Sequence, residues 1–148
     1  MDRRRRSGSI ASVAANCKLN LVHSIILPGY FDNMDDLFLS ADIVVHPARE
    51  PGACEFLPRA LAFAVPPIVT KTEWTDSLID PKQTGLVIPP QNPLAMAEAI
   101  IYALNNKPVC QQLGERARQL VNRLYCPQQQ ARKYLQLFET PTAARRSN

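Results

Sequence analysis

The chain has 148 residues, of which 46% are hydrophobic and 20% are charged; this excludes an intrinsically disordered protein and is enough for one domain with its own core. No apolar run approaches the roughly 18 residues of a membrane-spanning helix, and Arg3–Arg6 lead into Ser-Gly-Ser rather than into the apolar stretch of a signal peptide. The net charge of +4 lies at the two ends, because residues 7 to 144 hold 11 basic and 12 acidic side chains.

The basic ends have two interpretations. Arg3–Arg6 could contact nucleic acid or an anionic membrane surface, or they could belong to a frayed terminus. Since no aromatic residues interleave with these arginines, as they do in single-strand binders, we favour the frayed terminus and do not expect a nucleic-acid partner. A peripheral membrane contact stays open as an alternative. We expect disordered ends at residues 1–7 and 140–148 and one domain at residues 8–139.

The order of predicted elements alternates between helices and strands. Apolar periodicity, caps and proline positions define them. Within the helix at Pro93–Asn105, one apolar face holds Leu94, Ala97, Ile101 and Leu104. The predicted elements are a helix in residues 8–18, a strand at Val22–Leu27, a helix at Met34–Ser40, a strand at Ile43–His46, a helix at Leu57–Ala64, a strand at Ile68–Thr70, a helix at Trp74–Ile79, a strand at Leu86–Ile88, and helices at Pro93–Asn105, Pro108–Leu124 and around Ala131–Phe138.

This alternation predicts an α/β fold, in which a parallel sheet of about four strands lies between helices on both faces, as three layers. The set of strands is a partial Rossmann-like unit that begins in the middle of the usual pattern. In such folds ligands bind at the carboxyl ends of the strands. The stretch His46–Thr70 contains one of these strand ends, a loop, a helix and the next strand, so its loop is the candidate site.

The loop after His46 carries small and charged residues. Its small side chains would let backbone N–H groups approach a diphosphate, and the start of the following helix favours an anion. Two glutamates could bind sugar hydroxyls, and an arginine in the helix could pair with phosphate. A polar surface loop would show the same residues, so both interpretations stay open at this point. The residues are Gly52, Ala53 and Cys54, then Glu50 and Glu55, and then Arg59.

Other kinds of site are not indicated. The sequence has no Gly-x-Gly-x-x-Gly motif, Walker loop or nucleophile elbow. Its cysteines stand singly, without the Cys-x-x-Cys pairs of zinc sites, and are typical of free thiols in a reducing compartment. We therefore expect a cytoplasmic protein without a metal site. The four cysteines are Cys17, Cys54, Cys110 and Cys126.

Four segments resemble, in the same order, the C-terminal nucleotide-sugar-binding domain of GT-B glycosyltransferases of group 1, family 4. The resemblance covers roughly residues 8–138. It implies a retaining transferase that moves a sugar from a nucleotide donor to a glycan or lipid acceptor, without a metal or cofactor. The segments are ILPGYFDNMDDLFLSADIVVHPA, PRALAFAVPPIVT, TGLVIPPQNPLAMAEAI and LGERARQLVNRLYCPQQQARKYLQLFE.

The resemblance implies specific roles for the residues of this loop and of the helix start. The family carries two glutamates with seven residues between them, in a pattern like EGLPRAVIEAMAYGxPPIVT. The simplest alignment places Glu55 at the first glutamate, near the donor sugar, and deletes four residues together with the second, ribose-binding glutamate. An alternative alignment places Arg59 at the second position and Glu50 near the first. The amides of Phe56 and Leu57 and the side chain of Arg59 would approach the diphosphate.

Two further departures from the family bear on activity. Glu73 and Trp74 stand where the family usually has two glycines after the IVT strand, and a tryptophan cannot adopt every conformation of a glycine turn. The N-terminal acceptor domain and the first strand of this domain are not in the sequence. We therefore expect the chain alone to be weakly active or inactive, and to need a separate acceptor domain. A non-catalytic interaction module derived from a glycosyltransferase is the alternative.

Overall fold

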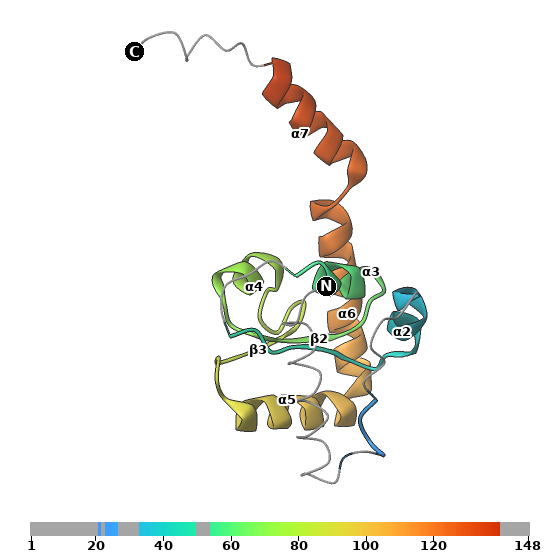
Figure 1. Ribbon diagram of the computed structural model, residues 1–148, viewed down its shortest axis with the longest axis vertical. Coiled ribbons are helices and arrows are strands. Elements are labelled where there is room, and N and C mark those ends of the chain that lie inside the picture. The colour runs from blue at the N-terminus through green and yellow to red at the C-terminus, as the bar shows by residue number, and fades with distance from the viewer. Residues whose placement is uncertain (1–20, 22, 27–32, 50–53, 140–148) are drawn as a thin grey trace, which may run out of the picture. The chain divides into compact units, whose positions relative to one another are not determined.

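The computed structural model describes residues 21, 23–26, 33–49 and 54–139. The chain divides into two compact units, Met1–Met34 and Asp35–Asn148. Almost all of the described helices and strands belong to the second unit (Figure 1). They are α2 at Met34–Ser40, β1 at Val44–His46, α3 at Phe56–Ala62, β2 at Pro67–Thr70, α4 at Glu73–Leu78, β3 at Leu86–Ile88, α5 at Pro93–Asn105, α6 at Lys107–Leu124 and α7 at Pro127–Glu139.

The sheet is parallel and has the order β1-β2-β3. Val45 pairs with Ile68, which in turn pairs with Leu86. In Figure 1, α5 covers one face of the sheet and α3 and α4 lie on the other, while α6 packs against both α3 and α5. The predicted three-layer α/β fold is confirmed. Every residue of β2 is buried, as expected of a central strand with helices on both faces.

The predicted strand at Val22–Leu27 is wrong for its described residues. His23 and Ser24 form a turn, because the N–H groups of Ser24 and Ile25 both donate to the Leu21 carbonyl, at 2.9 and 3.0 Å. Ile26 is 86% exposed. Local hydrogen bonds have replaced a strand ladder, so the described part of the sheet has three strands instead of about four. The predicted helix in residues 8–18 lies outside the described residues.

The packed face of α5 is not the apolar face that the sequence suggested. Met96, Ala99, Ile100 and Ala103 pack into a cluster with Ile68 of β2. This set has the i, i+3, i+4, i+7 spacing of a core-facing stripe. The other set, which also shares one face, is exposed; it consists of Leu94, Ala97, Ile101 and Leu104.

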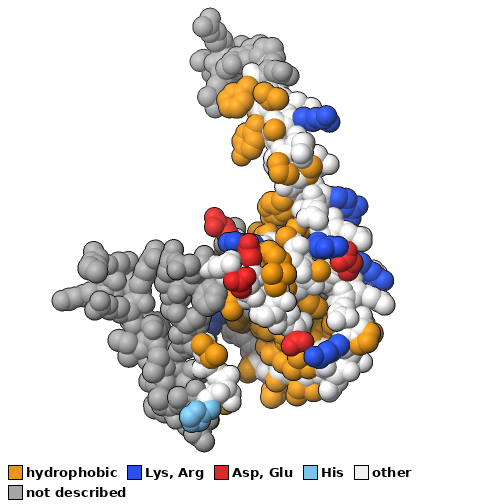
Figure 2. Space-filling model, turned by 90° about the vertical axis from the view of Figure 1, so that its right-hand side faces the viewer, with side chains coloured by type: hydrophobic (Ala, Val, Ile, Leu, Met, Phe, Trp, Pro, Cys, Tyr) orange, Lys and Arg blue, Asp and Glu red, His pale blue; other side chains and the backbone are white. Residues whose placement is uncertain are grey.

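The helix α7 exposes its hydrophobic side chains to solvent. Figure 2 shows such side chains along its surface. The predicted apolar spacing of this helix is present, but its members lie outside the core, and Phe138 is 84% exposed. None of the described helices is long and apolar enough to cross a membrane.

The end of α3 is a Schellman motif built on an alanine. The N–H of Val65 donates to the Ala60 carbonyl at 3.3 Å, and the N–H of Ala64 donates to the Leu61 carbonyl at 2.9 Å. These are the two hydrogen bonds of that motif, whose C′ residue is left-handed and usually glycine. Ala64 has φ of 60°, and it stands where the glutamate-pair pattern above has glycine.

We expect Ala64→Gly to stabilise the protein. A left-handed alanine costs roughly 1–2 kcal/mol that glycine avoids, while the added freedom of the unfolded glycine chain removes about half of that gain. The net expected increase in the free energy of unfolding is about 0.5–1 kcal/mol, measured by urea denaturation. The matched control is Ala62→Gly, in the last helical position, where the same substitution should lower stability. Equal losses from both variants would contradict a strained Ala64.

Candidate functional site at the carboxyl edge of the sheet

A cavity of about 520 Å³ lies where the three strands end. His46, Thr70 and Ile88 are the last residues of β1, β2 and β3, and the cavity lies between the segments that follow β1 and β3. Its volume is within the range of small-molecule sites. The lining residues are Pro47, Ala48, Arg49, Thr70, Ile88, Gln91, Asn92, Pro93 and Met96.

Threonine hydroxyls hold the floor of this cavity in place. The Thr70 Oγ1 donates to the Ala48 carbonyl at 2.7 Å and so ties the end of β2 to the segment after β1. The buried Thr75 Oγ1 donates to the Thr70 carbonyl at 2.8 Å and accepts from the Thr72 N–H at 2.8 Å. Together with the Thr72 side chain this is a reciprocal capping box. The cavity floor is therefore fixed by the fold before any ligand arrives.

The cavity wall is apolar with a polar, cationic rim. Ile88, Met96 and the prolines form the apolar part. Arg49 is exposed and forms no ion pair with a described residue. Gln91 has a left-handed backbone, with φ of 55°, and the Asn92 side chain caps α5 by accepting from the Ala95 N–H at 3.0 Å. No acidic side chain belongs to the described lining, so the rim favours an anionic or polar ligand.

The sequence-predicted loop residues fall into two groups. Glu50, Gly52 and Ala53 lie outside the described residues. Cys54 is half-buried and Glu55 is exposed, immediately before α3. Phe56 and Leu57 are the first two residues of α3, so their N–H groups have no acceptor within the helix, as the prediction requires. The Leu57 side chain is fully buried, which leaves only its main chain for a ligand.

Arg59 has a partner in the structure. Its Nε lies 2.9 Å and its Nη2 2.7 Å from Asp35 Oδ1, which connects α3 to α2. The arginine is the fourth residue of the seven-residue helix. Both side chains are about half exposed, so this ion pair contributes less than about 1 kcal/mol and a phosphate could compete for the arginine.

Comparison with known proteins decides the family. The family model for glycosyl transferases group 1 matches residues 14–120, which include the whole sheet and all the strand ends that form the cavity. The chain belongs to this family. No curated protein matches the sequence.

Solved structures agree with this glycosyltransferase assignment. The sucrose-phosphate synthase from Thermosynechococcus elongatus superposes with a TM-score of 0.77 at 26% identity, covering 92% of this chain and 34% of that protein. A glycosyltransferase from Rickettsia africae gives a TM-score of 0.84 at 22% identity, covering 92% and 37%. HepE from Anabaena, in complex with UDP-glucose, gives 0.78 at 14% identity, covering 92% and 38%. The chain thus spans little more than a third of these proteins.

In this glycosyltransferase domain the segment after β2 is a capped helix. Trp74, which stands at the family's glycine pair, is the second residue of α4, and its ring contacts His46 edge-on with centroids 5.8 Å apart. Burial lowers the pKa of His46 below its usual value, and its Nε2 has no hydrogen-bond partner among the described residues. The imidazole of His46 and the indole of Trp74 therefore pack together where β1 ends.

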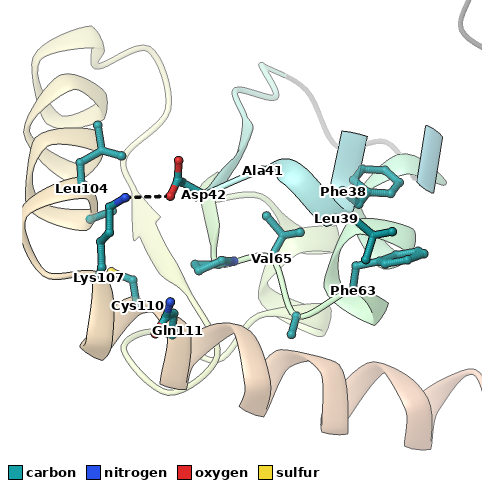
Figure 3. A pocket seen from close by; sticks show the side chains of 13 residues that line it. Phe38, Leu39, Ala41, Asp42, Phe63, Val65, Leu104, Lys107, Cys110 and Gln111 are labelled. Carbon is teal, nitrogen blue, oxygen red and sulfur yellow. Dashed lines mark hydrogen bonds and ion pairs between the residues drawn. The ribbon is translucent and has the colours of Figure 1, made fainter. Parts of the chain in front are cut away.

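A second cavity of the glycosyltransferase domain lies at the opposite edge of the sheet. It measures about 220 Å³, and Figure 3 shows Lys107 bridging to Asp42 at 3.0 Å beside Leu104. Cys110 lines it as a buried thiol whose pKa is raised by burial, so it is an unreactive packing group. The carboxyl-edge cavity is the better candidate site. The described residues contain no cluster of metal-ligating side chains.

The sequence prediction missed the part of the site that follows β3. The candidate binding residues predicted from the sequence do not include Arg49, Gln91 or Asn92. The usable signal was topological: all carboxyl ends of parallel strands meet at one edge, so the residues after Ile88 belong beside those after His46.

Proposed function

We propose that this chain is the donor-binding domain of a retaining glycosyltransferase, and that it binds a nucleoside-diphosphate sugar at the carboxyl edge of the sheet. The observation that carries the proposal is the carboxyl-edge cavity, within the segment that matches the group 1 family. The complex of HepE with UDP-glucose supports a uridine nucleotide as the first ligand to test.

The proposed chemistry needs orientation and electrostatic stabilisation more than a reactive side chain. Breaking the bond between sugar and diphosphate leaves negative charge on the diphosphate, and preorganised N–H groups and cations stabilise that charge. In this chain we assign these roles to the N–H groups of Phe56 and Leu57 and to Arg59 and Arg49. Glu55 is assigned to contact the donor sugar, with Glu50 as the alternative. The small side chains of Gly52, Ala53 and Cys54 are assigned to let the backbone approach the diphosphate closely.

We further propose that transfer requires a second, acceptor-binding domain and that the chain alone is weakly active at best. Two features support weak activity. The family's pattern of two glutamates is incomplete, so the chain lacks the carboxylate that would bind the ribose of the donor. Trp74 replaces a glycine next to the expected diphosphate position, and its indole packs on His46. The acceptor class is a glycan or lipid, and no metal or cofactor has an assigned role.

The test is a calorimetric titration of the full chain with UDP, GDP and ADP. We expect one of them to bind, and to stabilise the fold by about 2.7 kcal/mol at 100 times its dissociation constant. Arg49→Ala should weaken binding about tenfold, since a charge-assisted hydrogen bond is worth roughly 1.5–3 kcal/mol. The control is Arg118→Ala, which breaks an ion pair with Glu115 on α6 and should leave the affinity unchanged. Absence of binding at millimolar concentrations of all three would overturn the proposal.

A second candidate function is a non-catalytic interaction module, favoured by the exposed hydrophobic side chains of α7 (Figure 2). Leu137 and Phe138 are 72% and 84% exposed, and patches of this kind mark contact surfaces. The titration separates the two functions, because a pure interaction module has no reason to bind a nucleoside diphosphate.

A further inference from the structure

The second cavity lies at the amino edge of the sheet, beside the segments that precede β1 and β2. This amino-edge cavity has a charged end and an apolar end (Figure 3). Lys107 and Asp42 form an ion pair beside Leu104 at one end, and Phe38 and Phe63 lie at the other. The amino-edge cavity shares no lining residue with the carboxyl-edge cavity, so it is not part of the proposed donor site.

The volume of the amino-edge cavity limits the size of a ligand. Sites for drug-sized molecules measure roughly 300–1,000 Å³, so a cavity of about 220 Å³ is too small to enclose a nucleotide. A cavity of about 150 Å³ is known to hold a benzene ring. The amino-edge cavity therefore has room for one apolar group and a few further atoms, which is the size of an amino acid.

The apolar end is formed by packed aromatic rings. The Phe38 ring centroid lies 5.7 Å from that of Phe63 and 5.0 Å from that of Phe56, so its position is fixed by the fold. Val65 and Cys110, which are both buried, also line the cavity. Since these side chains are uncharged and mostly hydrocarbon, this end favours an apolar group that leaves water on binding.

The charged end carries one charge of each sign. Lys107 and Asp42 are the only charged side chains among the described lining residues, and the Lys107 Nζ lies 3.0 Å from the Asp42 Oδ1. A ligand with a single charge would be attracted by one of these groups and repelled by the other. A zwitterion avoids this conflict, because its carboxylate can accept from Lys107 while its ammonium group donates to Asp42.

The ion pair can bind such a ligand without opening. An ammonium group has more than one donor and a carboxylate more than one acceptor site, and the hydrogen bond between Lys107 and Asp42 uses one of each. The two side chains are 59% and 61% exposed, so a ligand reaches them from solvent. Binding therefore leaves no charge buried without a partner.

We propose that the amino-edge cavity binds a free hydrophobic α-amino acid, with its side chain towards Phe38 and Phe63, its carboxylate at Lys107 and its ammonium group at Asp42. This class of ligand combines an apolar group of limited size with two adjacent charges of opposite sign, and so matches both ends of the cavity. The dissociation constant should be on the order of 0.1–1 mM, as expected of so small a ligand. This binding does not depend on the proposed donor function.

An NMR titration of the full chain with leucine, methionine and phenylalanine tests the proposal. At least one should bind, with the largest amide shifts at Val65 and Ala103 rather than at Thr70 and Met96 of the carboxyl-edge cavity. Leucinamide and N-acetylleucine each keep one charge and should bind about fivefold more weakly than leucine, the size of one exposed ion pair. Glycine, which has no side chain, should not bind measurably.

Three results of this titration contradict the proposal. They are no binding of any of the three amino acids up to about 20 mM, well above the expected dissociation constant, shifts confined to the carboxyl edge, and equal affinities for leucine, leucinamide and N-acetylleucine.

Two variants test the charged end one charge at a time. Lys107→Gln should weaken leucine binding about fivefold without weakening that of leucinamide, which has no carboxylate for the lysine. Asp42→Asn should likewise weaken the binding of leucine but not that of N-acetylleucine. The matched control is Arg118→Gln, which breaks an ion pair of similar exposure on α6 and should bind leucine like the wild type. If Lys107→Gln and Asp42→Asn also bind leucine like the wild type, the ion pair does not hold the ligand and the proposal is wrong.

Discussion

Gly114→Ala should unfold the protein or lower its free energy of unfolding by about 3 kcal/mol or more. A Cβ at this position would lie 2.0 Å from the Ala64 carbonyl oxygen and 3.2 Å from the Pro66 nitrogen. Those are backbone atoms in the Schellman turn of α3, so no side-chain rotation can relieve the clash. Overpacking typically costs 1–3 kcal/mol even where side chains can adjust. The helices α3 and α6 would have to separate.

The sign of the change in the free energy of unfolding on Gly114→Ala shows whether close packing or helix propensity dominates at this position. In an unpacked helix, glycine to alanine would stabilise by roughly 0.5–1 kcal/mol. We expect the opposite at position 114, read by circular dichroism during urea denaturation. Gln112→Ala, an exposed change in the same helix, should stay within about 0.5 kcal/mol of the wild type. A Gly114→Ala protein as stable as the wild type would show that α3 and α6 do not approach this closely.

Much of the fold follows from local signals in the sequence. The bounds of α2 and α5 were predicted exactly, since Asn92 and Pro93 mark a helix start by capping and by a fixed φ. The strands β1, β2 and β3 were each found within one residue, because their short apolar runs alternate with helices. These features depend on residues close together in sequence, where periodicity and caps are informative.

Features that depend on distant partners were harder to predict. The apolar run before Pro28 has the pattern of a strand, but a strand also needs a neighbouring strand to pair with. The described residues of this run instead form a turn, in which the N–H groups of Ser24 and Ile25 donate to the Leu21 carbonyl. On α5, two stripes are apolar, and periodicity alone cannot tell which one meets the sheet. The close approach of Gly114 to Ala64 joins residues fifty positions apart, so no local pattern in the sequence could show it.

The sequence places its candidate site in the loop after β1, and the role of that loop in binding stays a prediction. The loop after β1 was identified because small residues and carboxylates follow a strand end. The structure adds the residues after β3 to the same edge, and it shows a competing partner for Arg59 in Asp35. Neither fact is local in sequence: one depends on strand order and the other on the packing of α2 beside α3.

Leu57→Ala should lower the free energy of unfolding by about 2–5 kcal/mol, the usual range for a buried leucine. The Leu57 side chain is fully buried at the second position of α3, and therefore anchors the helix start that follows the candidate donor loop. The helix has only seven residues, too few to be stable without packing. Removing the anchor should loosen this end of the helix together with the loop.

The matched variant for that anchor is Leu57→Met, which keeps the side-chain volume and should cost less than about 1.5 kcal/mol. Because the side chain cannot reach a ligand, Leu57→Met should also bind a nucleoside diphosphate with the affinity of the wild type. Urea denaturation and the nucleotide titration measure the two properties separately. If Leu57→Ala costs less than about 1 kcal/mol, burial does not fix the start of α3. If Leu57→Met loses nucleotide affinity at unchanged stability, the side chain itself takes part in binding.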